Sequence, residues 1–445
     1  MRFSAPIKPL ATAAFCALAL AACSSTNGSE DDPDPVVDSA PGTLLKSDID
    51  RDLDPAIDAA TFDEFSADNR DFAFSMLREL REAEAENNVF LSPYSISTAL
   101  GMTYAGAREN TKVEMSEALH FFLDDDELHS AFNKLDLELA TRSDFEPDED
   151  EDVAFDLDIV NQTWGHYDFP FEDAYLDLLA EHYGAGLYSV DFFNDFEEIR
   201  EGINKWVEQK TQDRIQDLLP ERSVTDRTRF ILVNAIYFYG SWENPFEDSR
   251  TQTRDFHLLD GSTTDVEMMS QSDVSFPYYE GSDTMAVSLP YVGDDVSMIA
   301  LMPTDETADF ATWEQEIGRE AFDEAVAGLS NREMTLNFPK FEDEGEFNLV
   351  GTFEDLGMID AFIDGTADFT GISTPSLHIS GIFHKSFISV DEEGTEAAAA
   401  TAVVMGIESA PADPLVVTVD RPFLYAIYDH PTDTILFLGR MVDPS

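Results

Sequence analysis

One segment near the C-terminus, EEGTEAAAATAVVMGIESAP (Glu392–Pro411), restricts most strongly how this chain can fold. It lies between two runs that predict β-strands, LHISGIFHKSFISVD before it and LVVTVDRPFLYAIYD after it. Its four consecutive alanines and other short side chains have little to bury, yet the segment is too long and too apolar for an ordinary turn. The fold must therefore accommodate a long segment of small side chains between two strands.

The alternation within this segment fits a strand that inserts between two others. One side of such a strand would carry Thr395, Ala397, Ala399, Thr401, Val403 and Met405. Small side chains can enter a sheet without a large space being ready for them, and Gly394 supplies flexible backbone just before. We therefore expect an insertable strand, with Thr395 as the first side chain to turn inward. An alanine-rich helix or a linker is the alternative that the composition allows.

Charge excludes several classes of partner. The chain has 445 residues, 43% of them hydrophobic, which is enough for a large core. The 91 acidic residues outnumber the 26 basic ones, the net charge is −65, and only eight basic residues are lysine. A surface this negative repels phosphate groups, so we expect neither a nucleic-acid partner nor binding to an anionic lipid surface. Adaptation to high salt and an unusually acidic secreted protein both explain the composition.

The first residues have the organisation of an export signal. Arg2 and Lys8 precede Leu10–Ala22, an apolar run too short to span a bilayer with confidence. The run ends in LAAC, which resembles the lipobox of bacterial lipoproteins and would make Cys23 the lipidated residue. We expect a signal peptide at residues 1–22 and export to the cell envelope, at the outer membrane or at the cell surface facing the extracellular space. Ordinary secretion with an incidental Cys23 is the alternative.

After the signal, residues 23–61 predict a flexible acidic tether, because Ser, Asp, Pro and Gly dominate the stretch SSTNGSEDDPDPVVDSAPG. The folded domain is expected at residues 62–445. The other cysteine, Cys16, lies inside the signal, so the mature chain has no disulfide and no thiol nucleophile. The fold must therefore be held by burial of its core.

Helical patterns dominate the first half of the folded part and strand patterns dominate the second. Helices are expected around residues 65–80, 93–103, 116–122, 127–139, 171–183, 195–210 and 309–327. Strands are expected at residues 153–165, 228–242, 333–342, 377–391, 415–429 and 434–442, and in several parts of 251–303. This order predicts an α+β fold without internal repeats.

No catalytic motif accompanies this fold. The chain lacks a nucleophile elbow, a phosphate-binding loop and a paired-histidine zinc motif, and its eight histidines are scattered. We therefore expect a protein that is not an enzyme and that needs no cofactor and no metal. A hydrolase with a site assembled from distant residues is the alternative.

Four separated blocks, in order, resemble the serpin family. They are NVFLSPYSISTALGMTYAGAREN, FILVNAIYFYGSWENPF, EEGTEAAAAT and DRPFLYAIYDHPTDTILFLGRMVDP. The resemblance extends from Phe62 to Ser445. It implies the serpin fold, with three β-sheets, eight or nine helices and an exposed reactive-centre loop, here at about residues 392–413.

The resemblance also implies a function. Inhibitory serpins are suicide substrates, in which a serine protease cleaves the loop and is trapped as an acyl-enzyme when the cut loop inserts into the main sheet. The expected partner is thus a serine protease, and the protein is expected to be a monomer that contacts membranes only through its lipid anchor. The alternative is a non-inhibitory serpin-fold surface lipoprotein with a carrier, chaperone or adhesive role.

Three groups of residues match family positions. The hinge comprises Glu392, Gly394, Thr395, Glu396, Ala397, Ala398, Ala399, Ala400 and Thr401. The shutter cluster, under the part of the sheet that opens, comprises Ser92, Ser95, Asn234 and His384. The breach group, where the loop enters the sheet, comprises Trp242 and a Glu392–Lys340 pair. Glu109 departs from the family pattern, since glycine is usual there, and Tyr239 and Ser241 replace common lysines.

The family spacing also suggests a reactive bond. Counting fourteen residues from Gly394 places it between Glu408 and Ser409, which suits a glutamyl endopeptidase. Counting back from the C-terminal block places it near Pro411. A bond after Met405 or Ile407 would instead suit subtilisin-, chymotrypsin- or elastase-like proteases.

Overall fold

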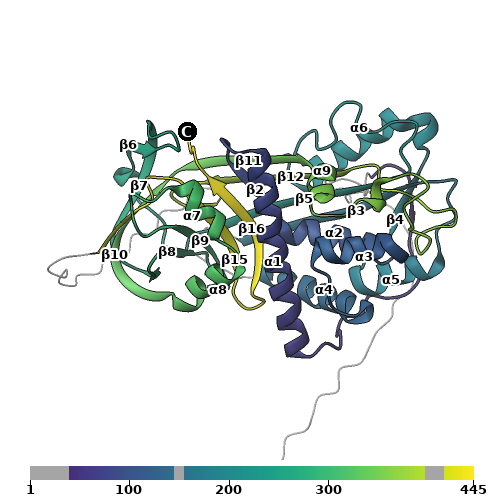
Figure 1. Cartoon of the computed structure of the whole chain (residues 1–445), viewed down its shortest axis with the longest axis horizontal. Coiled ribbons are helices and arrows are strands. Elements are labelled where there is room, and N and C mark those ends of the chain that lie inside the picture. The colour runs from purple at the N-terminus through teal and green to yellow at the C-terminus, as the bar shows by residue number, and fades with distance from the viewer. Residues whose placement is uncertain (1–39, 145–154, 396–414) are drawn as a thin grey trace, which may run out of the picture. The chain divides into compact units, whose positions relative to one another are not determined.

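The computed structural model describes residues 40–144, 155–395 and 415–445 (Figure 1). Within these ranges the chain forms nine α-helices and two hydrogen-bonded β-sheets, which confirms the predicted α+β class. The helices are α1 (Ala59–Ala83), α2 (Pro93–Tyr104), α3 (Glu109–Leu119), α4 (Asp125–Ala140), α5 (Asp173–Tyr183), α6 (Phe192–Lys210), α7 (Phe310–Glu316), α8 (Arg319–Gly328) and α9 (Val350–Asp355). Not one of these helices combines the length and apolar character needed to cross a membrane.

The main sheet has seven strands in the order β1-β4-β3-β5-β13-β12-β11. They are β1 (Thr43–Leu45), β4 (Leu187–Val190), β3 (Phe155–His166), β5 (Phe230–Ser241), β13 (Gly394–Thr395), β12 (Ile382–Val390) and β11 (Phe341–Asn348). The hinge therefore contributes a short strand of its own, β13, in the middle of this sheet.

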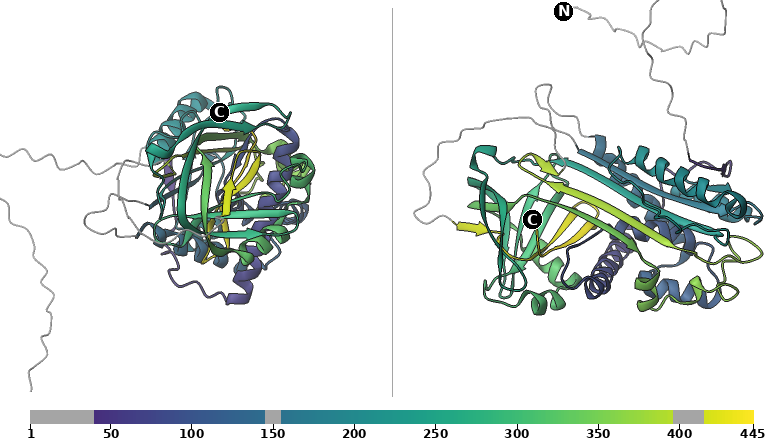
Figure 2. Two further views of the ribbon diagram at one scale, coloured as in Figure 1. Left: turned by 90° about the vertical axis from the view of Figure 1, so that its left-hand side faces the viewer. Right: turned by 90° about the horizontal axis from the view of Figure 1, so that it is seen from above.

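Helices cover both faces of the main sheet (Figure 2). The packing of the central strand β5 illustrates this. Its odd-numbered residues 231, 233 and 235 pack in a cluster with Ile203 and Trp206 of α6. Its even-numbered residues 232, 236 and 238 pack in the main core with the helices on the opposite face. A strand buried on both faces has a continuous apolar sequence, and FILVNAIYFY is such a run.

The second sheet has nine strands, in the order β14-β10-β7-β8-β9-β15-β16-β2 with β6 beside β7. They are β14 (Leu415–Thr418), β10 (Ser330–Pro339), β7 (Thr263–Glu280), β8 (Thr284–Pro290), β9 (Val296–Pro303), β15 (Phe423–Asp429), β16 (Thr434–Met441), β2 (Val89–Leu91) and β6 (Gln252–His257). Three sheets were expected, but the 18-residue β7 pairs with β6 and β10 along its length and with β8 at its end. This long strand joins two of the expected sheets into one network.

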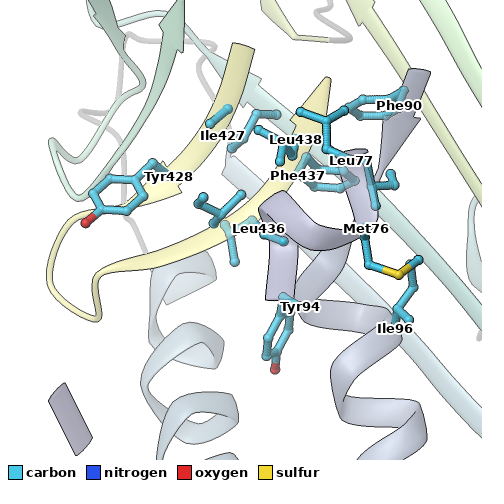
Figure 3. Packing of buried hydrophobic residues seen from close by; sticks show 14 of the residues in the cluster. Met76, Leu77, Phe90, Tyr94, Ile96, Ile427, Tyr428, Leu436, Phe437 and Leu438 are labelled. Atoms are coloured by element: carbon cyan, nitrogen blue, oxygen red, sulfur yellow. The ribbon is translucent and has the colours of Figure 1, made fainter. Parts of the chain in front are cut away.

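The main core lies where α1 crosses β16 (Figure 3). Met76 and Leu77 of α1 lie beside Phe437 of β16 and Phe90 of β2, and all four side chains are buried. The rings of Phe90 and Phe437 stack with centroids 5.3 Å apart. The C-terminal strands are thereby fixed to the N-terminal helices.

The tether prediction is wrong for residues 40–58, which we call the strap. Its strand β1 pairs antiparallel with the edge strand β4 of the main sheet. Arg51 Nε donates to Asn133 Oδ1 (2.8 Å) and Arg51 Nη2 to Asp136 Oδ2 (2.7 Å), both on α4. The amide of Asp52 donates to the carbonyl of Glu181 (2.9 Å). The strap is held largely by hydrogen bonds, which composition does not reveal. Residues 1–39, including Cys23, lie outside the described residues.

Glu109, the departure from the family pattern, has a strained backbone. Its φ is +47°, in the left-handed region that favours glycine. The local fold therefore retains the conformation for which glycine is usual, although this chain places glutamate there.

We predict that Arg51→Gln frees the strap without unfolding the domain. The lost bonds are partly exposed, so together they contribute about 1.4 kcal/mol, equivalent to roughly tenfold faster amide exchange. Hydrogen exchange of peptides covering residues 43–52 would show this. Arg250→Gln, which removes an exposed arginine paired with Glu247, is the control and should leave strap exchange unchanged. Equal exchange in wild type and Arg51→Gln would contradict the prediction.

Candidate functional site

A tight turn starts the hinge. The chain leaves β12 at Val390 and returns as β13 after three residues. The amide of Asp391 donates to the carbonyl of Gly394 (2.9 Å). In turn, Asp391 Oδ1 accepts the amides of Glu393 (2.9 Å) and Gly394 (3.3 Å). This turn directs the next residue, Thr395, back into the sheet.

Thr395 already lies between two strands. It pairs antiparallel with Gly240 of β5 on one side and with Val390 of β12 on the other, and its side chain is fully buried. We expected Thr395 to turn inward only on insertion. The structure corrects this, because the turn is short enough to bring Thr395 to both strands in the uncleaved chain.

Close contact with β5 requires a glycine at position 394. A Cβ atom on Gly394 would lie 2.1 Å from the carbonyl oxygen of Gly240, far inside van der Waals contact. Its φ is not among the positive values of the described glycines. The flexibility expected of this glycine is therefore less important than its small size against β5.

Below β13, the two flanking strands pair directly with each other. Residues 382–386 of β12 pair in parallel with residues 232–236 of β5, and paired residues differ by 150 in number. Val390 and Gly240 also differ by 150, but Thr395 lies between them. β5 and β12 thus keep one register along their length. The distance between them is roughly 4.8 Å where they pair directly and about twice that where Thr395 lies between them. The sheet is open at the breach and closed at the shutter.

The breach holds the carboxylate of Glu392. Lys340 Nζ donates to Glu392 Oε2 (2.6 Å) and Thr251 Oγ1 donates to Oε1 (2.5 Å). Burial alone would raise the pKa of Glu392, but the bonds from Lys340 and Thr251 outweigh burial and lower it. The backbone carbonyl of Glu392 also accepts the amide of Phe246 (2.7 Å). The predicted Glu392–Lys340 pair is therefore present and charged.

Trp242 fixes the turn from the other side. Its Nε1 donates to the carbonyl of Asp391 (3.0 Å), and its amide donates to the carbonyl of Glu393 (2.8 Å). Its ring stacks on Tyr291 with centroids 4.6 Å apart. The Tyr291 hydroxyl is 2.7 Å from the buried Thr395 Oγ1, so both hydroxyl groups are hydrogen-bonded.

The four predicted shutter residues form one cluster. His384 Nδ1 donates to Asn234 Oδ1 (2.5 Å), and His384 Nε2 accepts the amide of Ser92 (3.1 Å). Only a neutral imidazole with its proton on Nδ1 satisfies both bonds. Burial lowers the pKa of His384 to about 3, which agrees with a neutral ring.

The cluster connects three elements beneath the closed part of the sheet. Asn234 Nδ2 donates to Ser95 Oγ on α2 and to Asn161 Oδ1 on β3 (2.5 Å). Ser92 Oγ donates to the carbonyl of Leu436 (2.7 Å) and accepts the amide of Ser95 (3.2 Å), which caps α2. Ser92, a predicted shutter residue, thus also caps α2.

Sequence reasoning missed several partners. Asn161, Thr251 and Tyr291 bind predicted site residues but lie in other blocks of the chain. The only sequence signal for Asn161 is that it is a polar residue within a predicted strand of alternating apolar residues.

The remaining predicted residues lie outside the described ones. These are Glu396, Ala397, Ala398, Ala399, Ala400, Thr401, Glu408, Ser409 and Cys23. In the described part of the chain, no group of three or more His, Cys, Asp or Glu residues could hold a metal ion.

The buried neutral His384 gives a testable pH dependence. Its folded pKa of about 3 lies below the ordinary 6.5, so the unfolded chain takes up the proton first as pH falls. This residue should therefore lower the free energy of unfolding by up to about 1.4 kcal/mol per pH unit below about pH 6.5. Urea unfolding at several pH values should show that the wild type loses stability relative to His384→Gln as the pH falls below about 6.5. A difference in unfolding free energy between the two proteins that does not change with pH would contradict this account.

Comparison with known proteins agrees with this geometry. The family profile described as Serpin (serine protease inhibitor) matches residues 67–444. Leukocyte elastase inhibitor of Sus scrofa is 36% identical over 390 residues, covering 86% of this chain and 100% of that protein. An uncharacterized serpin-like protein of Thermococcus kodakarensis is 37% identical over 377 residues, covering 84% of each chain.

Solved structures match as well. The crystal structure of tengpin, a thermophilic serpin in its native state, superimposes with a TM-score of 0.76 at 26% identity and covers 90% of this chain and 97% of tengpin. The overall fold is thus that of a solved serpin structure. The chain belongs to the serpin family, whose members are protease inhibitors or non-inhibitory proteins and not enzymes.

Proposed function

We propose that this protein inhibits a serine protease by inserting its cleaved reactive loop into the main sheet. The observation that carries the proposal is the place of β13. Its two residues form a strand between β5 and β12, above a region where these two strands pair directly with each other. An uncleaved loop that begins inside the sheet is already aligned to continue there.

The register of β13 defines how a longer inserted strand would lie. Each further residue would move one position down both neighbours. Six residues after Thr395, Thr401 would lie opposite His384 (390 − 6) and Asn234 (240 − 6). Residues directly opposite in a sheet share a face, so Ala397, Ala399 and Thr401 would face the core with Thr395.

Insertion must break the shutter. The bond between His384 and Asn234 joins neighbouring strands, and it cannot persist when a strand separates them. The Thr401 hydroxyl would arrive at the same level and could bond to the groups that this bond releases. The buried polar groups would thus keep partners, which avoids a large desolvation cost.

Insertion would also disable the protease. In the proposed reaction the protease serine attacks the loop and forms an ester, and the loop then inserts before water hydrolyses it. About fourteen inserted residues at 3.3 Å each would carry the tethered protease roughly 46 Å. Pulling the ester out of a preorganised oxyanion hole and triad stops deacylation.

We predict that Ala399→Arg converts the inhibitor into a substrate. This residue would lie against the buried Ser386 and Ile236, so an unpaired guanidinium would be buried at a cost of several kcal/mol. Insertion and deacylation compete, so each 1.4 kcal/mol on the insertion barrier changes their ratio about tenfold. The stoichiometry of inhibition should therefore rise at least tenfold.

Ala398→Arg is the matched control, because residue 398 would lie on the sheet face opposite the main core, beside the half-buried Phe387 and Tyr237, which is 5% exposed. It should inhibit nearly as wild type. Equal inhibition by Ala399→Arg and wild type would refute insertion in this register.

The target protease follows from the reactive bond. We propose cleavage between Glu408 and Ser409 by a glutamyl endopeptidase, whose basic specificity pocket suits a glutamate. The family spacing supports this bond, while Met405 or Ile407 would favour subtilisin- or elastase-like enzymes.

We predict that Glu408→Arg redirects inhibition toward trypsin-like proteases. Mass spectrometry of the peptide released from wild type should show Ser409 as its first residue. A peptide starting at Gly406 or Ala412 would move the bond and contradict the assignment.

We further propose that the inhibitor is anchored to the cell envelope through a lipidated Cys23, as the order of basic residues, apolar run and LAAC motif suggests. Several acyl chains hold a protein to a membrane far more firmly than one. Cys23→Ala should therefore move the protein from the detergent phase to the aqueous phase after phase separation. Wild type that remains in the aqueous phase would disprove the anchor.

A further inference from the structure

The main sheet has an end opposite the breach, which we call the far end. There β3 and β4 finish side by side at His166 and Val190, and β5 begins at Phe230. The 12 residues of β5 span roughly 40 Å between the far end and the breach. Figure 1 shows β4 on one side of the domain and β10 on the other.

The strap begins near the far end. Its strand β1 runs antiparallel to β4, so the residues before β1 lie beside the last residues of β4. A Cβ atom on Gly42 would lie 2.5 Å from Val190 Cγ1, so the two residues are in close contact. The carbonyl of Pro41 accepts the indole Nε1 of Trp164 (3.1 Å), close to the last residue of β3. The chain that precedes Ala40 is therefore joined to the domain near the far end.

Two exposed aromatic side chains lie at the same end. Among the described residues three aromatic side chains are exposed, namely Phe122 (58%), Tyr167 (53%) and Phe193 (60%). The amide of Tyr167 donates to the carbonyl of Val190 (2.9 Å), and Phe193 follows Val190 by three residues. Tyr167, Phe193 and the start of the strap thus gather around the last residue of β4.

Local structure turns both rings toward solvent. Asp191 caps α6 by accepting the amide of Asn194 (3.1 Å), and Phe192 in the first turn is fully buried against the main sheet. One step along a helix rotates a side chain by about 100°, which takes Phe193 away from the sheet. Tyr167 is the first residue of the turn after β3. Exposed aromatic rings suit the interface between a bilayer and water.

The charges around the two rings favour a neutral lipid. Asp168 follows Tyr167 in the chain and Asp191 follows Val190, and their carboxylates raise the pKa of the Tyr167 hydroxyl. Two acidic groups beside the rings repel the phosphates of an anionic lipid. A zwitterionic lipid surface has no net charge and leaves the apolar contact unopposed.

The length of chain before the strap favours the same end. Taken as the flexible coil that their composition predicts, the residues between Cys23 and Ala40 would reach roughly 22 Å on average. The far end is then within reach of a bilayer that holds Cys23. The breach lies beyond this average reach, because it is roughly 40 Å farther along the sheet.

We propose that the far end rests on the surface of a zwitterionic lipid bilayer, with the rings of Tyr167 and Phe193 among the headgroups. This inference rests on the proposed lipid anchor and adds a second contact to it. The anchor keeps both rings at a high effective concentration near the bilayer, so a weak apolar contact suffices. The breach and the start of the reactive loop then face away from the membrane, where a protease can reach them.

A fluorophore that senses polarity tests the contact. The mature chain has no cysteine besides Cys23, whose thiol the lipid would occupy, so an introduced cysteine can be labelled alone. The lipidated protein with Asp168→Cys would carry a nitrobenzoxadiazole dye and be reconstituted in phosphatidylcholine vesicles. The emission should shift to the blue and about double in intensity relative to the labelled Cys23→Ala protein in buffer, because the bilayer interface is less polar than water. A label at Val416→Cys on β14 should not respond.

Variants at exposed positions identify the rings. Tyr167→Ser combined with Phe193→Ser should return the emission at position 168 to its value in buffer, while the protein still floats with the vesicles. Phe122→Ser removes an exposed aromatic ring elsewhere and should change nothing. Phosphatidylglycerol added to the vesicles should weaken the shift, and a stronger shift would contradict the choice of a neutral lipid.

The remaining outcomes separate the contact from the anchor. Protein that floats with unchanged emission at position 168 would overturn the contact and leave the anchor intact. Protein that does not float would overturn the anchor. A hexahistidine tag in place of Cys23, bound to a nickel-chelating lipid, then tests the contact alone, and unchanged emission would refute it. A shift that needs no vesicles and grows with protein concentration would show that the rings bind protein, and would also overturn the proposal.

Discussion

The antiparallel pairing of Thr395 with β5 and β12 is the interaction on which the rest of the site depends. It separates the upper ends of two strands that keep one register and pair directly lower down. The breach group serves this arrangement, because Trp242, Lys340 and Thr251 bind the turn that delivers Thr395. Gly394 permits it by leaving space where its backbone meets that of Gly240.

The shutter opposes any further opening. Five register pairs and the bond between His384 and Asn234 close the lower part of β5 and β12. A strand that inserts there would replace one ladder of backbone hydrogen bonds with two, so the inserted state gains more bonds than it loses. Under the proposed mechanism the uncleaved fold would be kinetically held, and the polar cluster would contribute to the barrier.

Sequence analysis predicted the parts of this fold that depend on local pattern. The strand predicted at residues 228–242 and the helix predicted at residues 93–103 correspond to β5 and α2. It missed what depends on contacts between distant segments. The strap lacks a continuous apolar run and is held by Arg51 and backbone bonds, so it was predicted as a tether. The length of β7, which merges two sheets, and the bond from Tyr291 to Thr395 appear only when the chain is folded.

Thermal unfolding before and after a single cut in the reactive loop tests the central claim most directly. If the cut loop becomes a strand between β5 and β12, the melting temperature should rise by about 6 °C or more, as expected for roughly 5 kcal/mol of added stability in a domain of this size. The amides of residues 232–236 and 382–386 should remain protected, because each strand would acquire the new strand as its partner. An unchanged or lower melting temperature, with the loop shown to be cut, would contradict the account.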